Sequence, residues 1–182
     1  MVKKLAAAAS VVGVAGFIAA AAVAGDRGKD FETDLNGFEE VPAVSTAAGA
    51  EVKAEVNRAG TEIRYRLRYR NLEGAVSQSH IHFAQKGVNG GIAVFLCSNL
   101  GNGTADTPAC PASPATVTGT LDAGDVSAVP ASAGAVTQGI GQGEFDELVR
   151  AMRAGVTYAN VHTDRWPGGE VRGQIDQEHD RD

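Results

Sequence analysis

Apolar and polar residues alternate along much of this chain, which is the pattern of β-strands with one buried face. The clearest case is segment 61–70, in which aliphatic and tyrosine residues alternate with arginines. Segment 51–57 alternates in the same way between small apolar residues and charged ones. When the two apolar faces lie together, a two-residue turn at 59–60 pairs Glu55 with Arg64. The pattern therefore predicts a β-hairpin with one apolar and one charged face.

Shorter segments extend the β-structure along the chain. The fold is expected to begin at 31–35, and Pro42 confines the stretch around it to an edge or irregular segment, because proline donates no ladder hydrogen bond. Segment 92–97 is apolar on both faces, which is typical of a strand at the centre of a sandwich. Segment 116–121 alternates threonine with apolar residues and predicts one more strand. The stretch 123–143 is rich in Gly, Ala and Ser and predicts only loop with short turns.

One segment has helical instead of strand periodicity. Within 144–154, Phe145, Leu148, Val149 and Met152 recur at the spacing of one helix face. Acidic residues occupy the first turn of this segment and arginines the last, and a glycine follows as a stop signal. We expect one short helix that packs its apolar stripe on the sheets.

The most polar strand faces lie in two places. A C-terminal segment predicts two strands joined by a Trp-Pro-Gly-Gly turn, because proline presets one turn dihedral and glycine accepts positive φ. In the first of these strands Tyr158, Asn160 and His162 share the face opposite to the apolar one. A five-residue loop brings apolar residues together across the two strands. The cross-strand pairs on the polar face are then His162 with Glu170 and Asn160 with Arg172.

His80 and His82 have the same arrangement on an earlier segment, where Ile81 and Phe83 face the opposite way. If this strand and the C-terminal strands share a sheet, the polar side chains converge. Three of the four histidines of the chain would then lie in one cluster.

The N-terminus has the pattern of a cleaved signal peptide. Lys3 and Lys4 precede an apolar stretch rich in alanine and valine, which ends at Ala-Val-Ala before the polar Gly25. An uncleaved membrane anchor is the alternative, because the stretch is about long enough to span a bilayer. We expect a signal peptide at 1–24, a linker at 25–30, one β-domain at 31–177 and a polar tail at 178–182. The mature protein would be periplasmic or extracellular, with no stable membrane span after signal removal.

Cys97 and Cys110 are the only cysteines. An even pair in an exported chain predicts a disulfide more than a metal or redox site. Closing a loop of this size stabilises a protein by roughly 3 kcal/mol in the chain-entropy model.

The charge balance limits the classes of partner. The formal net charge is −6 at pH 7, which disfavours nucleic acid. The arginine row in 64–70 could bind a polyanion such as a sulfated glycan, but a solvated face partly neutralised by glutamates is the simpler interpretation. An extracellular protein or glycan is therefore the expected kind of partner, with its identity open.

The histidines allow two interpretations. His80, His82 and His162 could supply three nitrogen ligands to a copper or zinc ion, because neutral imidazole suits both metals. Glu170 would then orient His162 or serve as a fourth ligand. In the alternative, the imidazoles bind Asn160, Arg172 and backbone groups and only fix the sheet. The arginine, which would repel a nearby cation, favours this structural interpretation.

Several motifs together resemble the CHRD (chordin) domain. They are the Leu35–Pro42 stretch, His-Ile-His at 80–82, Tyr-Ala-Asn-Val-His-Thr at 158–163 and Pro-Gly-Gly-Glu-Val-Arg-Gly-Gln at 167–174. The resemblance covers nearly all of the chain after residue 30 and implies a secreted, β-rich fold. We expect an all-β, antiparallel β-sandwich of Greek-key type, similar to immunoglobulin domains or superoxide dismutase, with one short helix.

The expected function is that of a non-catalytic extracytoplasmic binding or structural module. Asn160, Glu170 and Arg172 are the candidate ligand-binding residues. The alternative is a metal-binding protein for redox or metal handling, because the His-x-His strand is similar to the copper-ligand strand of Cu,Zn superoxide dismutase. That enzyme needs more histidines than the three in this cluster, so its activity is not carried over. No nucleophile elbow or catalytic acid pair is recognisable, and an enzyme is not expected.

Overall fold

The computed structural model describes residues 30–177. The predicted signal peptide, the predicted tail and all of the predicted linker except Asp30 lie outside this range. Nine strands follow one another with short helical segments between them. They are β1 (Asp30–Asn36), β2 (Gly49–Val56), β3 (Ile63–Arg70), β4 (Val76–Phe83), β5 (Gly91–Ser98), β6 (Ala115–Leu121), β7 (Thr157–Thr163), β8 (Val171–Gln174) and β9 (Asp176–Gln177).

The described helices are short. They are α1 (Ala133–Thr137) and α2 (Phe145–Arg153), with single 3-10 turns at Gly37–Glu39 and Pro130–Ser132. The sequence predicted α2 to within one residue at each end but did not predict α1. Residues 30–177 therefore contain two short α-helices where one was expected. Among residues 30–177, no helix is long and apolar enough to cross a membrane.

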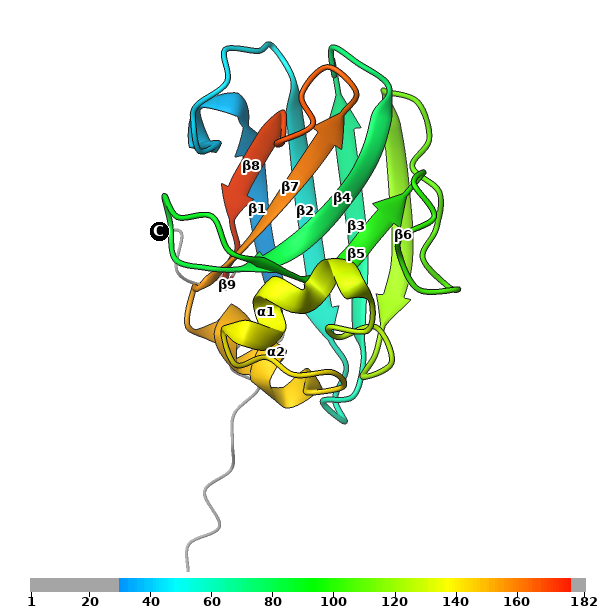
Figure 1. Ribbon diagram of the computed structural model, residues 1–182, viewed down its shortest axis with the longest axis vertical. Helices are drawn as coiled ribbons and strands as arrows, with labels where there is room; N and C mark the ends of the chain where they lie inside the picture. The colour runs from blue at the N-terminus through cyan, green and yellow to red at the C-terminus, as the bar shows by residue number, and fades with distance from the viewer. Residues whose placement is uncertain (1–29, 178–182) are drawn as a thin grey trace, which may run out of the picture.

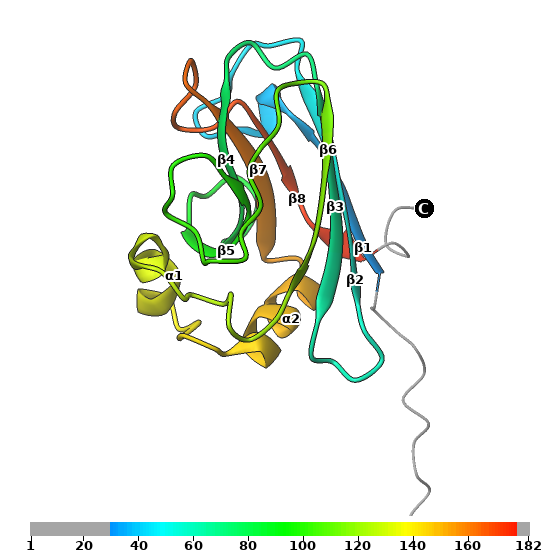
Figure 2. The ribbon, with the colours of Figure 1, turned by 90° about the vertical axis from the view of Figure 1, so that its right-hand side faces the viewer.

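All strand pairs are antiparallel and follow the order β5-β4-β7-β8-β1-β2-β3-β6, with β9 paired to β1. The all-β antiparallel prediction is thus confirmed. The sheet bends back on itself so that β5, β4, β7 and β8 face β1, β2, β3 and β6, and it is nearly closed (Figures 1 and 2). The two halves are joined where Asn36 of β1 pairs with Arg172 of β8. The more detailed Greek-key arrangement stays a prediction.

The predicted β2–β3 hairpin is confirmed in its register. Glu55 lies opposite Arg64, and Glu51 lies opposite Arg68. The four arginines of β3 are all exposed, while the residues between them are buried. This exposed row lies on the outer face of the half of the sheet that contains β3, on the opposite side of the core from β4 and β7.

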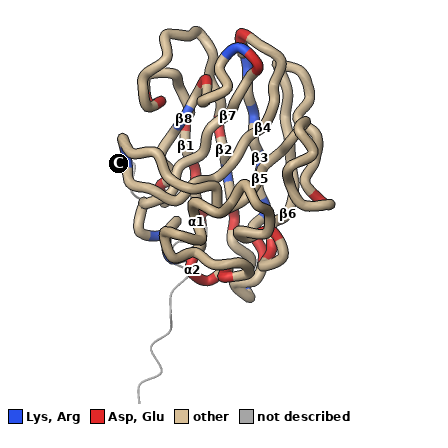
Figure 3. The backbone as a smooth tube through the Cα atoms, in the orientation of Figure 1, with Lys and Arg blue, Asp and Glu red and all other residues tan. Residues whose placement is uncertain are grey.

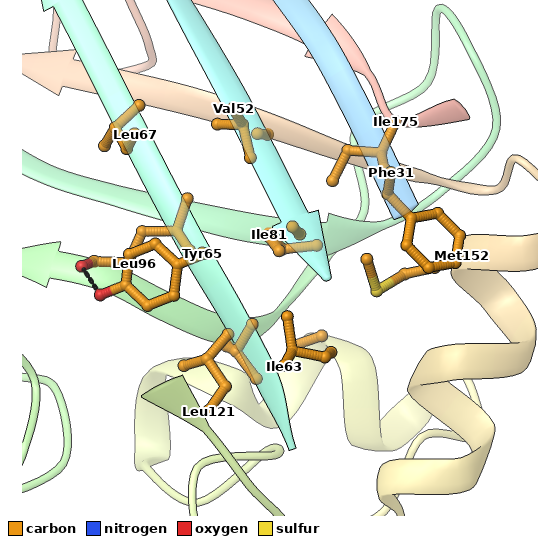
Figure 4. Close-up of a cluster of buried hydrophobic side chains, with 14 of the residues drawn as sticks. Phe31, Val52, Ile63, Tyr65, Leu67, Ile81, Leu96, Leu121, Met152 and Ile175 are labelled. Atoms are coloured by element: carbon orange, nitrogen blue, oxygen red, sulfur yellow. Dashed lines mark hydrogen bonds between the residues drawn. The ribbon is translucent and has the colours of Figure 1, made fainter. Parts of the chain in front are cut away.

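The core fills the space between the two halves of the sheet. Figure 4 shows side chains from β2 and β3 meeting Ile81 of β4 and Met152 of α2. The hydroxyl of Tyr65 crosses this space and donates a 2.6 Å hydrogen bond to the carbonyl of Leu96 on β5. Helix α2 closes one end of the core with the apolar stripe that its spacing predicted.

Strand β5 differs from its predicted position. Its apolar residues indicated a central strand, but β5 lies at one end of the strand order. Helix α1 covers it instead, because the backbone of Gly91 packs directly on the backbone at Gly134 and Ala135. The predicted disulfide between Cys97 and Cys110 is present and ties the end of β5 to the loop before β6.

Candidate metal centre

Three histidine side chains meet on the outer face of two adjacent strands. His80 and His82 come from β4 and His162 from β7, and these strands pair directly, with His80 opposite Asn160. The ring centroids of His80 and His162 are 4.9 Å apart, and those of His80 and His82 are 5.3 Å apart. One ring nitrogen from each of the three residues lies within 4.8 Å of the others. The cluster predicted from the sequence is therefore formed.

Strand alternation places the cluster. Ile81 and Val161 turn inward and have no exposed surface, so their neighbours along each strand turn outward. The outward residues are nevertheless buried, with exposed fractions of 0 % for His80 and 7 % for both His82 and His162. A site on the outer face of a sheet stays this dry only when another part of the chain covers it.

Part of the cover is the loop between β4 and β5, residues 84–90, which contacts His82 and which we call the covering loop. The β7–β8 loop contributes the carbonyl of Pro167, which contacts His162. The carbonyl of Gly90 accepts a 2.9 Å hydrogen bond from Nδ1 of His82. The side chain of Asn89 donates to the carbonyl of Val41 at 3.0 Å. Gly90 itself must lack a side chain, because a Cβ there would overlap the carbonyl of Phe83. The covering loop is thus attached both to the cluster and to the segment after β1.

The hydrogen bonds of the rings leave nitrogen lone pairs aimed into the cluster. His82 and His162 both donate from Nδ1 to backbone carbonyls, those of Gly90 and Pro167, at 2.9 Å. A neutral imidazole that donates from Nδ1 carries its lone pair on Nε2. Nε2 of His162 is buried and has no hydrogen-bond partner, and neither nitrogen of His80 makes a well-formed hydrogen bond, although the side chain of Asn160 lies close enough to oppose the lowering of the His80 pKa. Backbone carbonyls that fix the ring of a histidine in this way are typical of metal-binding histidines.

Asn160 contacts one of these lone pairs. Its side-chain oxygen Oδ1 lies 3.1 Å from Nε2 of His82. Since this nitrogen carries a lone pair, a hydrogen bond forms only if the amide presents its NH₂ group, which requires a half-turn of the amide. With the amide in that orientation, Asn160 donates a hydrogen bond to Nε2 of His82 when no ion is bound, as the structural interpretation expected.

All three imidazoles are held in the neutral form. Burial lowers the pKa of His80 well below its ordinary value, and the neighbouring rings of His162 and His82 lower it further. Burial likewise lowers the pKa of His82 to about 4. The pKa of His162 is lowered for the same reason, against the hydrogen bond to Pro167. Neutral imidazole is the protonation state that binds metals.

A stack of three side chains supports His82. Its ring lies parallel to the ring of Tyr158 with centroids 4.6 Å apart, and the guanidinium of Arg172 lies 3.4 Å from the centroid of the tyrosine ring. Arg172 donates to Oδ1 of Asn89 at 3.0 Å and to the carbonyl of Val88 at 2.7 Å. The arginine thus holds the covering loop and does not contact the histidines.

Glu170 has a different role from the one expected. The β7–β8 ladder confirms Asn160 opposite Arg172 but ends at Val161 and Val171, one pair before His162. The carboxylate of Glu170 turns away and accepts hydrogen bonds from the hydroxyls of Thr46 and Thr163 and from a backbone amide. His162 is oriented by the carbonyl of Pro167 instead.

The sequence reasoning missed two residues of the site. Tyr158 was placed on the face of Asn160 and His162, but nothing in the alternation predicts its stacking between His82 and Arg172. Glu40, from the irregular segment near Pro42, is buried with one oxygen unpaired, and burial raises its pKa to about 7 although Arg172 opposes this. No local pattern could bring Glu40 to this site, because the contact depends on how the loop after β1 folds back.

Comparison with known families matches residues 31–175 to the CHRD domain. The match includes all three histidines, the covering loop and the disulfide. Comparisons with curated proteins and with solved structures found no match.

Proposed function

The chain belongs to the CHRD domain family, and we propose that it is an exported module that binds one transition-metal ion, copper or zinc, through His80, His82 and His162. The family and the disulfide fit an extracellular protein, since disulfides persist in oxidising compartments. Export itself rests on the pattern of the first 24 residues.

The observation that carries the proposal is the set of unpartnered ring nitrogens. Buried polar atoms are nearly always hydrogen-bonded, because leaving one unpaired costs about 1–3 kcal/mol. Here both nitrogens of His80 and Nε2 of His162 are buried without a well-formed hydrogen bond, and one nitrogen of each of the three rings lies within 4.8 Å of the others. A bound ion would satisfy one nitrogen of His80 together with Nε2 of His162, while the other nitrogen of His80 keeps its proton.

The geometry requires a small adjustment. Ligand bonds of about 2 Å need nitrogens roughly 3.3–3.6 Å apart. The present spread of up to 4.8 Å closes if the rings move by about 1 Å toward a common point. His82 would exchange its contact with Asn160 for the ion.

Untagged protein would test this proposal by metal analysis and thermal unfolding with Zn²⁺, Cu²⁺ and, without oxygen, Cu⁺. We expect one ion per chain and, at a hundredfold excess over the Kd, a rise in Tm of about 5–10 °C, since an ion that binds only the folded state stabilises it. Substituting any of the three histidines by glutamine should abolish stoichiometric binding. His179→Gln, which changes the fourth histidine, is the matched control and should bind normally.

The competing interpretation gives the opposite result. If the imidazoles only fix the sheet, as the contact between His82 and Asn160 favours, none of the three ions should bind stoichiometrically or raise the Tm. That outcome would leave a non-catalytic binding or structural module whose partner is a protein or glycan.

A further inference from the structure

The charges around the cluster bear on which ion it holds. Among the described residues the cluster contains three imidazoles and no carboxylate or thiolate. Both cysteines of the chain are joined in the disulfide. Imidazole binds a metal ion in its neutral form, so the ligand set as a whole is neutral. An ion bound here keeps its full charge.

The two strands that carry the histidines contribute no charge to offset it. Neither β4 nor β7 contains a Lys, Arg, Asp or Glu residue (Figure 3). The ring of Phe95 stands edge-on to His80 with centroids 4.5 Å apart, and Tyr158 covers one face of His82. Aromatic rings and the covering loop therefore replace water around the site. The free energy needed to bury an ion rises with the square of its charge, so a dication costs about four times as much as a monocation.

The nearest fixed cation increases this difference. Arg172 lies on the far side of the Tyr158 ring from His82 and contributes to the lowered pKa of His82. It is buried, with 2 % of its surface exposed, so water screens its charge poorly. Its repulsion of an ion in the cluster is proportional to the charge of that ion.

The number of ligands points the same way. Zinc in protein sites is four-coordinate, and where the protein supplies three ligands a water completes the shell, while Cu²⁺ favours square-planar or tetragonal sites. The cluster offers three nitrogens, and Asn160 is the further side chain that contacts one of them among the described residues. In this buried site three nitrogens complete the shell of an ion of low coordination number, whereas zinc would also need a buried water.

We propose that the site selects copper in its monovalent state, Cu⁺, over Zn²⁺ and Cu²⁺. This inference rests on the proposed function, because it concerns the same three histidines. The inference names the ligand as monovalent copper, and the reason for the preference is the charge of the ion.

Competition titrations would test the preference on the whole mature chain at one pH. Cu⁺ would be measured without oxygen against a chromogenic Cu⁺ chelator, and Zn²⁺ against a zinc chelator. We expect a Kd for Cu⁺ at least about tenfold below that for Zn²⁺, which corresponds to about 1.4 kcal/mol. An equal or lower Kd for Zn²⁺ would overturn the preference while leaving metal binding intact. Failure of all ions to bind would overturn both proposals.

Arg172→Met tests the physical reason. Removing the cation should tighten binding of both ions, and the factor for Zn²⁺ should be about the square of the factor for Cu⁺. Arg172→Lys keeps the charge and should preserve the ratio of the two Kd values. Arg68→Met, on the exposed outer row of β3, is the matched control and should change neither Kd.

A second variant covers the case in which Arg172→Met does not fold. Glu40 is buried and close enough to Arg172 to interact with its charge, and Glu40→Gln removes a negative charge at pH 8, above the pKa of about 7. This variant should weaken Zn²⁺ more than Cu⁺. Equal changes for the two ions in either variant would overturn the argument from charge.

Discussion

Each histidine of the cluster is harder to protonate in the folded protein than in the unfolded chain. The ordinary pKa of 6.5 falls for all three because burial disfavours the charged imidazolium. The unfolded chain therefore takes up protons first as the pH falls. This difference makes the free energy of unfolding depend on pH.

Acidification should destabilise the metal-free protein below pH 6.5. The stability that the neutral rings contribute is complete above 6.5 and is lost as the pH falls toward the folded pKa, about 4 for His82. Each ring contributes a slope of about 1.4 kcal/mol per pH unit in that window. Urea unfolding in EDTA at pH 7, 6 and 5 would measure it. In His82→Gln the slope of the unfolding free energy against pH should fall by the contribution of one ring, which is one proton taken up on unfolding. In His179→Gln the slope should not change.

Glu40 acts with the opposite sign. Its folded pKa, about 7, lies above the ordinary 4.5, so its contribution to stability is complete below pH 4.5 and is lost as the pH rises through 7. It therefore partly masks the effect of the histidines. The pH dependence should be steeper in Glu40→Gln, and an unchanged or shallower profile would contradict the assignment of these pKa shifts.

At the scale of elements, the junction between β8 and β1 decides whether the sheet is continuous. Gly173 lies where the two strands cross closely, and a Cβ there would overlap the backbone oxygen of Asp34 and the hydroxyl of Thr33. The pairing of Asn36 with Arg172, which joins the two halves of the sheet, is next to this contact.

Gly173→Ala should therefore destabilise the protein by about 1–3 kcal/mol, the usual cost of overpacking. Gly168→Ala is the matched control, because a Cβ at Gly168 meets no atom within 4 Å. Its effect should stay within about 0.5 kcal/mol. Equal stability of the two variants in urea unfolding would show that the junction is not tightly packed.

The sequence predicted those elements whose two faces differ most. In β3 arginines alternate with apolar residues, so a shift of one residue would bury four charges, and the register with β2 follows from that. Strand β5 is apolar on both faces, and its sequence does not say whether strands or a helix will cover it. Helix α1 is only five residues long, Ala-Gly-Ala-Val-Thr, and has no period to detect.

The same reasoning explains which parts of the site were predictable. Alternation places His80 and His82 on one face of their strand and His162 on the polar face of another, and the three rings meet because β4 and β7 pair directly, which the sequence left as a condition. The position of Glu170 was not predictable in this way, since it depends on where the ladder ends and the loop begins. Contacts made by loops, such as Glu40 near Arg172, depend on tertiary structure that no local pattern describes.

At the scale of the whole molecule, the disulfide holds a long loop to the sheet. It links residues 13 positions apart, between the end of β5 and the segment before β6. Asn99 reinforces this link, since its side chain accepts from the backbone amide of Cys110 and donates to its carbonyl. The loop is thus attached by hydrogen bonds as well as by the disulfide.

Replacing both cysteines by alanine should lower the free energy of unfolding by about 3 kcal/mol and leave the fold intact. Adding Asn99→Ala should lower it further, because the second attachment is then also lost. Urea unfolding of the two variants against the oxidised parent would measure both steps. A parent that loses no stability on reduction of the disulfide would contradict this account.

The covering loop also affects how fast a bound ion would exchange with solution. It is fastened to Arg172, His82 and Val41, beside rings that are at most 7 % exposed. An ion bound to His82 should leave faster when these hydrogen bonds open together, so we expect the rate of exchange to depend on how often they do. A module of this kind would behave as a slow reservoir, which retains its ion against a faster competitor for longer than its affinity alone would allow.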